Sequence, residues 1–221
     1  MTTILIARHG QSDWNQEKRW QGHADRPLSE RGREQAQALA NRLAHIELDA
    51  VYSSDLQRAR DTAAVVAENQ ELELEQLPEL REVDVGSWSG LTRPEAEERF
   101  PEGFTRWRDG YPGWKDGETY EAMTDRVLGA VQRIAAEHEG GRVLVVSHGG
   151  PIRALHAAAL GLDVHSYRRL RPVEPNARLS AVCVVDGKLT ELCPAREIDA
   201  LIARDQEARR EAAAQPPTPA G

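Results

Sequence analysis

The amino-acid sequence predicts an α/β fold, a three-layer α/β/α sandwich in which helices cover both faces of a mostly parallel sheet. Short apolar runs typical of buried strands alternate along the chain with stretches of helical periodicity. Elements in that order form parallel sheets with helical crossovers. The chain has 221 residues, of which 40% are hydrophobic, which is enough for one large domain with a substantial core. We expect that domain to span residues 1–195.

Four elements are expected in the first third of the chain, each from its own local signal. They are a strand over residues 3–8, a helix that begins after Ser29, a strand over residues 49–53, and a helix that begins at the pair Ser54 and Gln57. The strands are short apolar runs, and apolar residues at helical spacing follow Ser29, a typical N-cap. Ser54 and Gln57 have the spacing of a capping box. The helix behind them carries Arg58 in its first turn.

The rest of the chain contains a long irregular segment between clearer elements. The clearer elements are an edge strand within residues 71–77, an amphipathic helix closed by Gly140 and Gly141, a strand over 142–147, a helix that begins at Gly149–Pro151, and a hairpin over 177–193. Residues 78–117 are expected to be loop with one short helix near residues 95–100, and such a segment is often a functional lid. Residues 196–221 are expected to be a charged, then Pro-rich tail that is partly disordered.

Composition limits the partners of the protein. The formal net charge of −8 argues against nucleic acid as a partner, although a small cationic pocket on an acidic surface would still bind an anionic substrate. No apolar stretch approaches the roughly 18 to 20 residues of a membrane span, and the N-terminus lacks the basic start of a signal peptide. Cys183 and Cys193 lie too far apart along the predicted hairpin for a disulfide. We therefore expect a cytoplasmic protein without a membrane partner, either a monomer or a homodimer.

Two His-Gly pairs indicate where the chemistry lies. His9-Gly10 and His148-Gly149 each follow an apolar run that predicts a buried strand. In open α/β sheets, ligands bind outside the carboxyl ends of the strands, so both imidazoles face one pocket if the two strands are neighbours. The other histidines do not follow a strand in this way, and surface positions are expected for His45 and His138.

Cationic groups near these histidines predict an anion site. Arg8 directly precedes His9, and Arg58 lies in the first turn after a strand, at the same sheet edge if the connection is a right-handed crossover. Guanidinium groups bind phosphate bidentately and stay charged, and the free N–H groups of the helix that starts at Gly149 add a further anion site. The alternative for Arg58 is a surface ion pair with a nearby aspartate.

A phosphate pocket that contains two imidazoles points to phosphoryl transfer. A neutral imidazole attacks phosphorus to give a phosphohistidine, and cationic groups stabilise charge on the equatorial oxygens. A general acid must protonate the departing alkoxide and later deprotonate water. From spacing alone, Glu79, Glu82 and Asp84 are equivalent choices for that acid, and a solvated carboxylate is the alternative for each.

Several motifs that carry these residues follow one another in a fixed order. They are Arg8-His9-Gly10-Gln11-Ser12-Asp13-Trp14-Asn15, Gln21-Gly22, Ser53-Ser54-Asp55-Leu56-Gln57-Arg58-Ala59, Leu80-Arg81-Glu82, Gly117-Glu118-Thr119 and Ser147-His148-Gly149-Gly150. This ordered set, which covers about residues 3–193, resembles the signature of the histidine phosphatase superfamily, in its phosphoglycerate mutase-like branch. The resemblance implies the phosphoglycerate mutase-like form of the predicted α/β sandwich.

The same resemblance implies a role for each predicted site residue. It implies that His9 is phosphorylated, and that Glu82 is the proton donor. The residues that hold the phosphoryl group or line its pocket are then Arg8, Arg58, His148, Asn15, Gln21, Gly22 and Gly149. No metal is expected, and a zinc site built from the two histidines is disfavoured because neither lies in a short metal-ligand spacing.

Two activities fit this resemblance, and a third function comes from another class. A phosphatase admits water and releases phosphate from a small phosphorylated metabolite, without a cofactor. A cofactor-dependent phosphoglycerate mutase excludes water and uses 2,3-bisphosphoglycerate. A phospho-ligand binding protein without turnover is the third. Gln21 and the short segment before Gly117 resemble the phosphatases, so we favour a metal-independent phosphomonoesterase.

Residues 83–117 are expected to set the substrate. The candidates for a substrate-facing lid are the aromatic residues Trp88, Trp107, Tyr111 and Trp114. The alternative is that these rings anchor a long loop to the core. Arg106 and Arg108 are candidates for binding a second anionic group, with surface solvation as the alternative.

Overall fold

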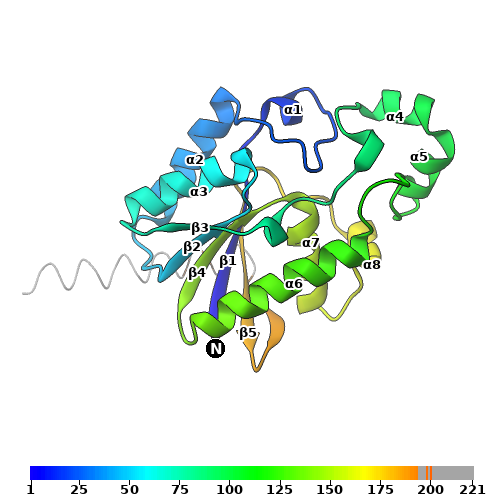
Figure 1. The fold of residues 1–221 in the computed structure, drawn as a ribbon. Coiled ribbons are helices and arrows are strands. Elements are labelled where there is room, and N and C mark those ends of the chain that lie inside the picture. Colours follow the sequence, from blue (N-terminus) through cyan, green and yellow to red (C-terminus); the bar gives the residue numbers. More distant parts are fainter. Residues whose placement is uncertain (194–197, 199, 201–221) are drawn as a thin grey trace, which may run out of the picture.

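Helices pack on both faces of one six-stranded sheet in the computed structural model, which describes residues 1–193, 198 and 200 (Figure 1). The strands are β1 (Thr2–Arg8), β2 (Ala50–Ser53), β3 (Leu74–Gln76), β4 (Arg142–Ser147), β5 (Leu179–Val185) and β6 (Lys188–Cys193), in the order β3-β2-β4-β1-β5-β6. Strands β1 to β4 pair in parallel, and β5 and β6 add an antiparallel hairpin at one edge. The prediction of a mostly parallel sheet is confirmed.

Alternation along the central strand divides the core into two layers. The helices are α1 (Asp13–Gln16), α2 (Glu30–Leu43), α3 (Gln57–Asn69), α4 (Arg93–Arg99), α5 (Pro101–Arg108), α6 (Tyr120–Glu137), α7 (Gly149–Ala159) and α8 (Val164–Leu170). Because successive strand residues point to opposite faces, Ile4 and Ile6 pack with the residues of α6 and α7, whereas Leu5 and Ala7 pack with those of α2 and α3. The α/β/α sandwich follows.

The register of the two central strands places the two His-Gly pairs side by side. Strands β1 and β4 are parallel neighbours, and Arg8 pairs with Ser147 at their carboxyl ends. The His9 N–H donates to the Ser147 carbonyl at 3.0 Å. The expectation that both histidines leave adjacent strands at one edge of the sheet therefore agrees with the structure.

Helix α3 begins differently from the prediction. Its N-cap is Leu56, which makes no side-chain cap bond, and the Ser54 hydroxyl accepts the Leu56 N–H instead. The Gln57 N–H donates to the Asp25 carboxylate at 2.6 Å, from the loop after α1. The capping box was wrong because a carboxylate distant in sequence caps the helix. Arg58 still lies in the first turn.

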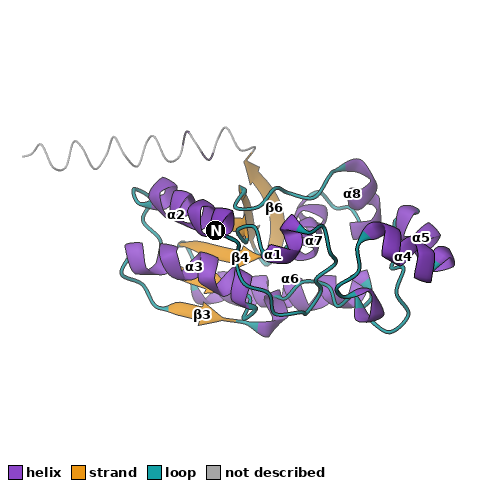
Figure 2. Cartoon of the chain, turned by 90° about the horizontal axis from the view of Figure 1, so that it is seen from above, coloured by secondary structure: helices purple, strands orange, loops and turns teal. Residues whose placement is uncertain are grey.

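The segment 78–117 is more ordered than the sequence indicates. It contains two 3-10 turns, η1 (Pro78–Leu80) and η2 (Gly86–Trp88), and the helices α4 and α5, where one short helix was predicted. Pro101 at the start of α5 separates it from α4, since proline cannot continue a helix but suits its first turn. In both views α4 and α5 lie at one end of the molecule, beyond the end of the sheet (Figures 1 and 2).

Two predictions concern regions that the structure describes only in part. Within the described residues, no helix is long and apolar enough to cross a membrane. The predicted tail over 196–221 lies almost wholly outside those residues. The tail and the domain boundary at residue 195 therefore stay predictions.

Candidate active site

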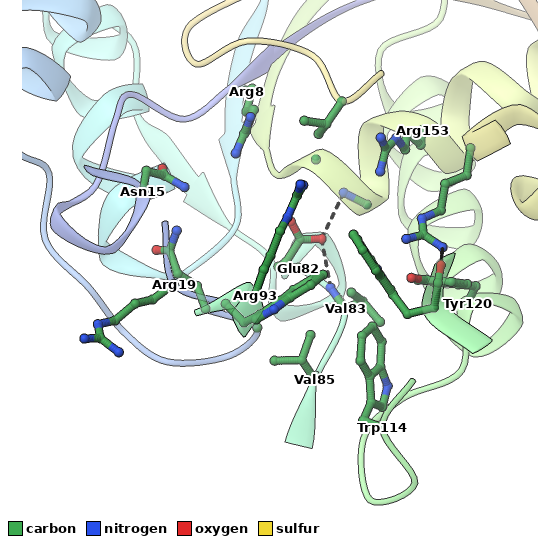
Figure 3. Close-up of a pocket in the computed structure, with 18 of the residues that line it drawn as sticks. Arg8, Asn15, Arg19, Glu82, Val83, Val85, Arg93, Trp114, Tyr120 and Arg153 are labelled. Atoms are coloured by element: carbon green, nitrogen blue, oxygen red, sulfur yellow. Dashed lines mark hydrogen bonds between the residues drawn. The ribbon is translucent and has the colours of Figure 1, made fainter. Parts of the chain in front are cut away.

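A pocket of about 610 Å³ opens at the carboxyl ends of β1 and β4 (Figure 3). The predicted site residues that line it are Arg8, His9, Asn15, Gln21, Gly22, Arg58, Glu82 and Gly149. His148 lies against His9, with ring centroids 5.0 Å apart. The structure thus brings every predicted site residue to one place. Figure 3 shows Glu82 near the middle, with Arg8 and Asn15 on one side and Arg153 and Tyr120 on the other.

The His9 ring is held as a neutral nucleophile would be. Its Nδ1 atom lies 2.6 Å from the carbonyl oxygen of Gly10, so Nδ1 carries the hydrogen, because a carbonyl only accepts. Burial lowers the pKa of His9 well below its ordinary value, and the nearby charges of Arg58 and Arg8 lower it further. The neutral ring therefore has its lone pair on Nε2.

The glycine after His9 is required by close packing. Its N–H donates to the Thr62 hydroxyl at 2.9 Å. A Cβ at Gly10 would come within 2.4 Å of the carbonyl oxygen of Gly32 on α2. The end of β1 is thus pressed between α2 and α3, and this packing fixes the backbone that carries His9.

Unpartnered buried nitrogens surround the His9 ring. Within the described part of the chain, both ring nitrogens of His148 and the Nε atoms of Arg8 and Arg58 are buried without a hydrogen-bond partner. Burial is also the main cause of the lowered pKa of His148, followed by the charge of Arg58. Buried polar groups are nearly always paired, and leaving them unpaired is costly. An oxyanion bound here would supply acceptors for these groups.

Hydrogen bonds to backbone carbonyls hold the side chains of Arg58 and Arg8 beside the His9 ring. Arg58 is buried, and it donates to the carbonyls of Gly22 and Ala24 at 2.9 and 2.8 Å. Burial lowers its pKa to about 10. Arg8 donates from Nη1 to the Glu174 carbonyl at 2.7 Å. The alternative of a surface ion pair for Arg58 is wrong, since its side chain is buried and bonds to backbone carbonyls.

Geometry separates the three carboxylates that spacing left equivalent. Glu82 Oε1 accepts the N–H groups of Val83 and Gly150 at 3.0 and 2.9 Å, and Oε2 is left facing the pocket side of α7. Glu79 instead pairs with Arg133 on the surface. Asp84 accepts a backbone N–H of its own loop and does not line the pocket.

The backbone beneath Glu82 is held by Arg126 and His23, which no sequence signal indicated. Arg126 on α6 donates to the Glu82 carbonyl at 2.9 Å and to those of Glu79 and Arg81 at 2.7 and 2.8 Å. It also forms two hydrogen bonds, each 2.7 Å, to the Glu118 carboxylate. His23 Nε2 lies 2.8 Å from the Glu82 carbonyl as well.

The amide side chains of Asn15 and Gln21 present donors to the pocket. Asn15 Oδ1 accepts the Ser12 N–H at 3.1 Å in a capping box that starts α1. Gln21 Oε1 accepts the Ser12 hydroxyl at 2.8 Å. Because both amide oxygens are occupied, the NH₂ groups are the ends left for a bound oxyanion.

The residues predicted for the lid and the two arginines predicted for a second anion divide into two groups. Trp107, Trp114 and Arg108 line the pocket. The others do not: Trp88 is fully buried and stacks on two phenylalanine rings, and Tyr111 and Arg106 line a separate hollow beside His165. For Trp88 the alternative of an anchor to the core is the correct one.

The outer wall of the pocket, meaning the lining residues outside the group around His9, also holds residues that the sequence did not single out. They are Arg19, Trp20, Arg93, Tyr120, Arg153, Arg168 and Arg169. Arg153 lies four residues after Gly149 on α7, and residues at that spacing share one face of a helix. That spacing was a usable signal, whereas Arg168 lies on the short helix α8, which was not predicted. Within the described residues, no group of three or more His, Cys, Asp or Glu could hold a metal ion.

Known proteins are similar to this chain in sequence and in fold. A family model described as histidine phosphatase superfamily (branch 1) matches residues 4–193. Phosphoserine phosphatase 1 of Hydrogenobacter thermophilus is 38% identical over 76% of this chain and 80% of its own length. The metal-independent phosphoserine phosphatase of Arabidopsis thaliana is 40% identical over 71% of this chain and 68% of its own. The solved structure of Bacillus stearothermophilus YhfR superimposes with a TM-score of 0.82 at 32% identity, over 88% of this chain and 97% of that one.

The chain belongs to the histidine phosphatase superfamily. The family predicted from the ordered motifs is confirmed, and so is the prediction of a phosphatase of that superfamily.

Proposed function

We propose that this chain hydrolyses small phosphomonoesters through a phosphohistidine on His9, without a metal or a cofactor. The observation that carries the proposal is the His9 ring, whose Nδ1 faces the Gly10 carbonyl while unpartnered nitrogens of Arg8, Arg58 and His148 are buried around it. A nucleophile with a fixed tautomer, next to groups that neutralise equatorial oxygens, is what phosphoryl transfer to an imidazole needs.

In the first step, the Nε2 lone pair of His9 attacks phosphorus and the ester P–O bond breaks. Glu82, in its protonated form, gives the proton to the departing oxygen, so an alcohol leaves rather than an alkoxide. The proton belongs on Oε2, because Oε1 accepts two backbone N–H groups. Arg8, Arg58 and His148 bind the phosphoryl oxygens throughout.

In the second step, water takes the place of the alcohol. Ionised Glu82 removes a proton from the water as its oxygen attacks phosphorus, and the P–N bond to His9 breaks. Inorganic phosphate leaves, and both residues return to their starting states. The same carboxylate thus acts as acid and then as base at one position.

The relatives direct the choice of substrate. Because two of them are named phosphoserine phosphatases, phosphoserine is the first candidate among small phosphorylated metabolites. We also infer that the enzyme works in the cytoplasm, where thiols stay reduced, since Cys183 is a free thiol. For its assembly we infer a monomer or a homodimer, as predicted from the sequence.

A phosphate-release assay with excess chelator tests this function. Its substrates are phosphoserine, 3-phosphoglycerate and p-nitrophenyl phosphate, with a parallel assay for conversion of 3- to 2-phosphoglycerate. We expect phosphate release that the chelator does not change. Interconversion without release would contradict the proposal in favour of a mutase, and binding without either reaction would favour a phospho-ligand binding protein.

A further inference from the structure

The charges on the pocket wall exceed what one phosphoryl group needs. The lining arginines are Arg8, Arg19, Arg58, Arg93, Arg108, Arg153, Arg168 and Arg169, and the only acidic residue among the lining residues is Glu82. Two of these arginines, Arg8 and Arg58, lie at His9. Arg19 is neutralised by ion pairs with Glu17 and Glu95. The other lining arginines form a cationic wall in a chain of net charge −8. Such a local concentration of positive charge favours binding of a second anionic group.

Arg153 and Arg168 stand out because they are partly buried and form no ion pair among the described residues. Arg153 Nε is buried without a hydrogen-bond partner. Arg168 donates to the Trp107 carbonyl at 2.9 Å, and its guanidinium lies over the rings of Trp107 and Tyr120, at 4.8 and 5.5 Å from their centroids. Burial lowers the pKa of both groups, and for Arg153 the charge of Arg168 adds to the effect. Two like charges that line one pocket without an ion pair are stabilised by an anion bound in that pocket.

Helix α7 sets the distance of Arg153 from Gly149, which lies beside the proposed phosphate position. Gly149 is the first residue of α7, and Arg153 lies one turn further along, a rise of about 6 Å. Helical side chains lean toward the helix N-terminus, so the Arg153 guanidinium points back toward the pocket. An anionic group bound at the Arg153 guanidinium would therefore lie within a few bonds of a phosphate bound at His9, if both belong to one small molecule.

We propose that Arg153 and Arg168 form a second oxyanion subsite, which binds a carboxylate or second phosphate of the substrate a few bonds from the scissile phosphate. The planar guanidinium fork suits either group. This inference rests on the proposed phosphatase function and narrows its substrates to phosphomonoesters that carry a second acidic group. The subsite is formed by residues of α7 and α8. It therefore differs from Arg106 and Arg108, the two arginines that the sequence suggested for binding a second anion.

Matched substrate pairs test the subsite. Phosphoserine and phosphoethanolamine differ only in the carboxylate, as 3-phosphoglycerate and glycerol 3-phosphate differ in a carboxylate and a hydroxymethyl group. Ethylene glycol bisphosphate and ethylene glycol monophosphate, whose phosphates are joined by two carbons, test a second phosphate. For at least one pair, we expect wild-type kcat/KM to be about 10- to 100-fold higher for the member with the second anion, as a charge-assisted hydrogen bond provides. The pair that shows the ratio identifies the second group as carboxylate or phosphate.

The variants Arg153→Gln and Arg168→Gln are expected to bring that ratio close to one, while kcat/KM for p-nitrophenyl phosphate stays within about twofold of wild type. Arg31→Gln, on the exposed side of α2, is the matched control and keeps the ratio. A wild-type ratio near one for every pair, or a ratio that survives in both variants, overturns the subsite. Absence of phosphate release from p-nitrophenyl phosphate by the wild-type enzyme would instead overturn the proposed function.

Discussion

The inner end and the outer wall of the pocket are built in different ways. The inner end, around His9, His148 and Arg58, comes from the ends of two paired strands and the first turn of α3, and these side chains are buried. The outer wall comes from the loop after α1, from α4 to α8 and from their connections, and two of its arginines, Arg93 and Arg168, lie over the Trp107 ring. The sheet therefore fixes the groups proposed for the chemistry, whereas residues further along the helices α5, α7 and α8 supply the groups proposed for substrate choice.

The largest expected effect is at the inner end. His9→Ala removes the proposed nucleophile, and we expect kcat to fall by about 10³-fold or more, as when a nucleophile is removed from other covalent enzymes. The measurement is phosphate release from p-nitrophenyl phosphate. The exposed His45→Ala variant is the control and keeps wild-type kcat. Turnover by His9→Ala at the wild-type rate would contradict the proposed nucleophile, and with it the claim that the inner end carries the chemistry.

A smaller effect is expected beneath Glu82. Arg126→Met removes the bonds to three carbonyls and the Glu118 carboxylate, so the backbone that carries Glu82 loosens. We expect kcat to fall about 10- to 100-fold with little change in KM, because Arg126 positions the acid and does not line the pocket. Arg133→Met, two turns along α6 and exposed, is the matched control. A change confined to KM would show that Arg126 has no part in positioning Glu82.

The outer wall is expected to act mainly on substrate choice. Trp107→Ala removes the ring on which Arg168 and Arg93 rest, at 4.8 and 5.3 Å. We expect about a tenfold loss of kcat/KM for the substrate with a second anion, since the cation–π contact that places Arg168 is lost. For p-nitrophenyl phosphate, kcat/KM is expected to change by less than about twofold. Equal losses of kcat/KM for both substrates would show that Trp107 supports the reaction of any substrate, and would contradict a role in substrate choice alone.

The smallest effect expected is on the pH dependence of stability. The folded pKa of His9 lies below the unfolded value, so the folded state prefers the neutral ring. The stability this provides is complete above about pH 6.5 and is lost as the pH falls below that value. We expect the free energy of unfolding of His9→Gln to fall less steeply than that of wild type between pH 6.5 and 5.5, by about 1 kcal/mol per pH unit.

Urea unfolding at several pH values measures this difference. The exposed Gln37→Ala variant, which removes no titratable group, is expected to keep the wild-type slope. Identical slopes for wild type and His9→Gln would contradict a buried, neutral His9.

The sequence predicted the inner end because its signals are local. Apolar runs followed by His-Gly locate two strand ends, and parallel pairing then brings them together. The choice of Glu82 over Glu79 came from the family resemblance alone, and only the structure supplies a geometric reason. The role of Arg126 leaves no trace in the spacing of residues, because it depends on α6 packing against η1.

The outer wall could not be predicted for a related reason. Trp88 and Trp107 are both tryptophans in one irregular stretch, yet one is fully buried in the core and the other lines the pocket. Which ring faces inward depends on how α5 packs, not on periodicity. The predicted capping box of Ser54 and Gln57 failed for the same reason, since Asp25, which accepts the Gln57 N–H, is distant in sequence.

The central claim is that the phosphoryl group passes through His9. Glu82→Gln with p-nitrophenyl phosphate tests it most directly, because that leaving group needs little protonation while hydrolysis of the phosphoenzyme lacks its base. After rapid quenching at alkaline pH and digestion, peptide mass spectrometry locates the phosphoryl group. We predict a phosphorylated peptide that carries the modification on His9 and accumulates above the wild-type level. A phosphoryl group on another residue, or none on any peptide during turnover, would contradict the account.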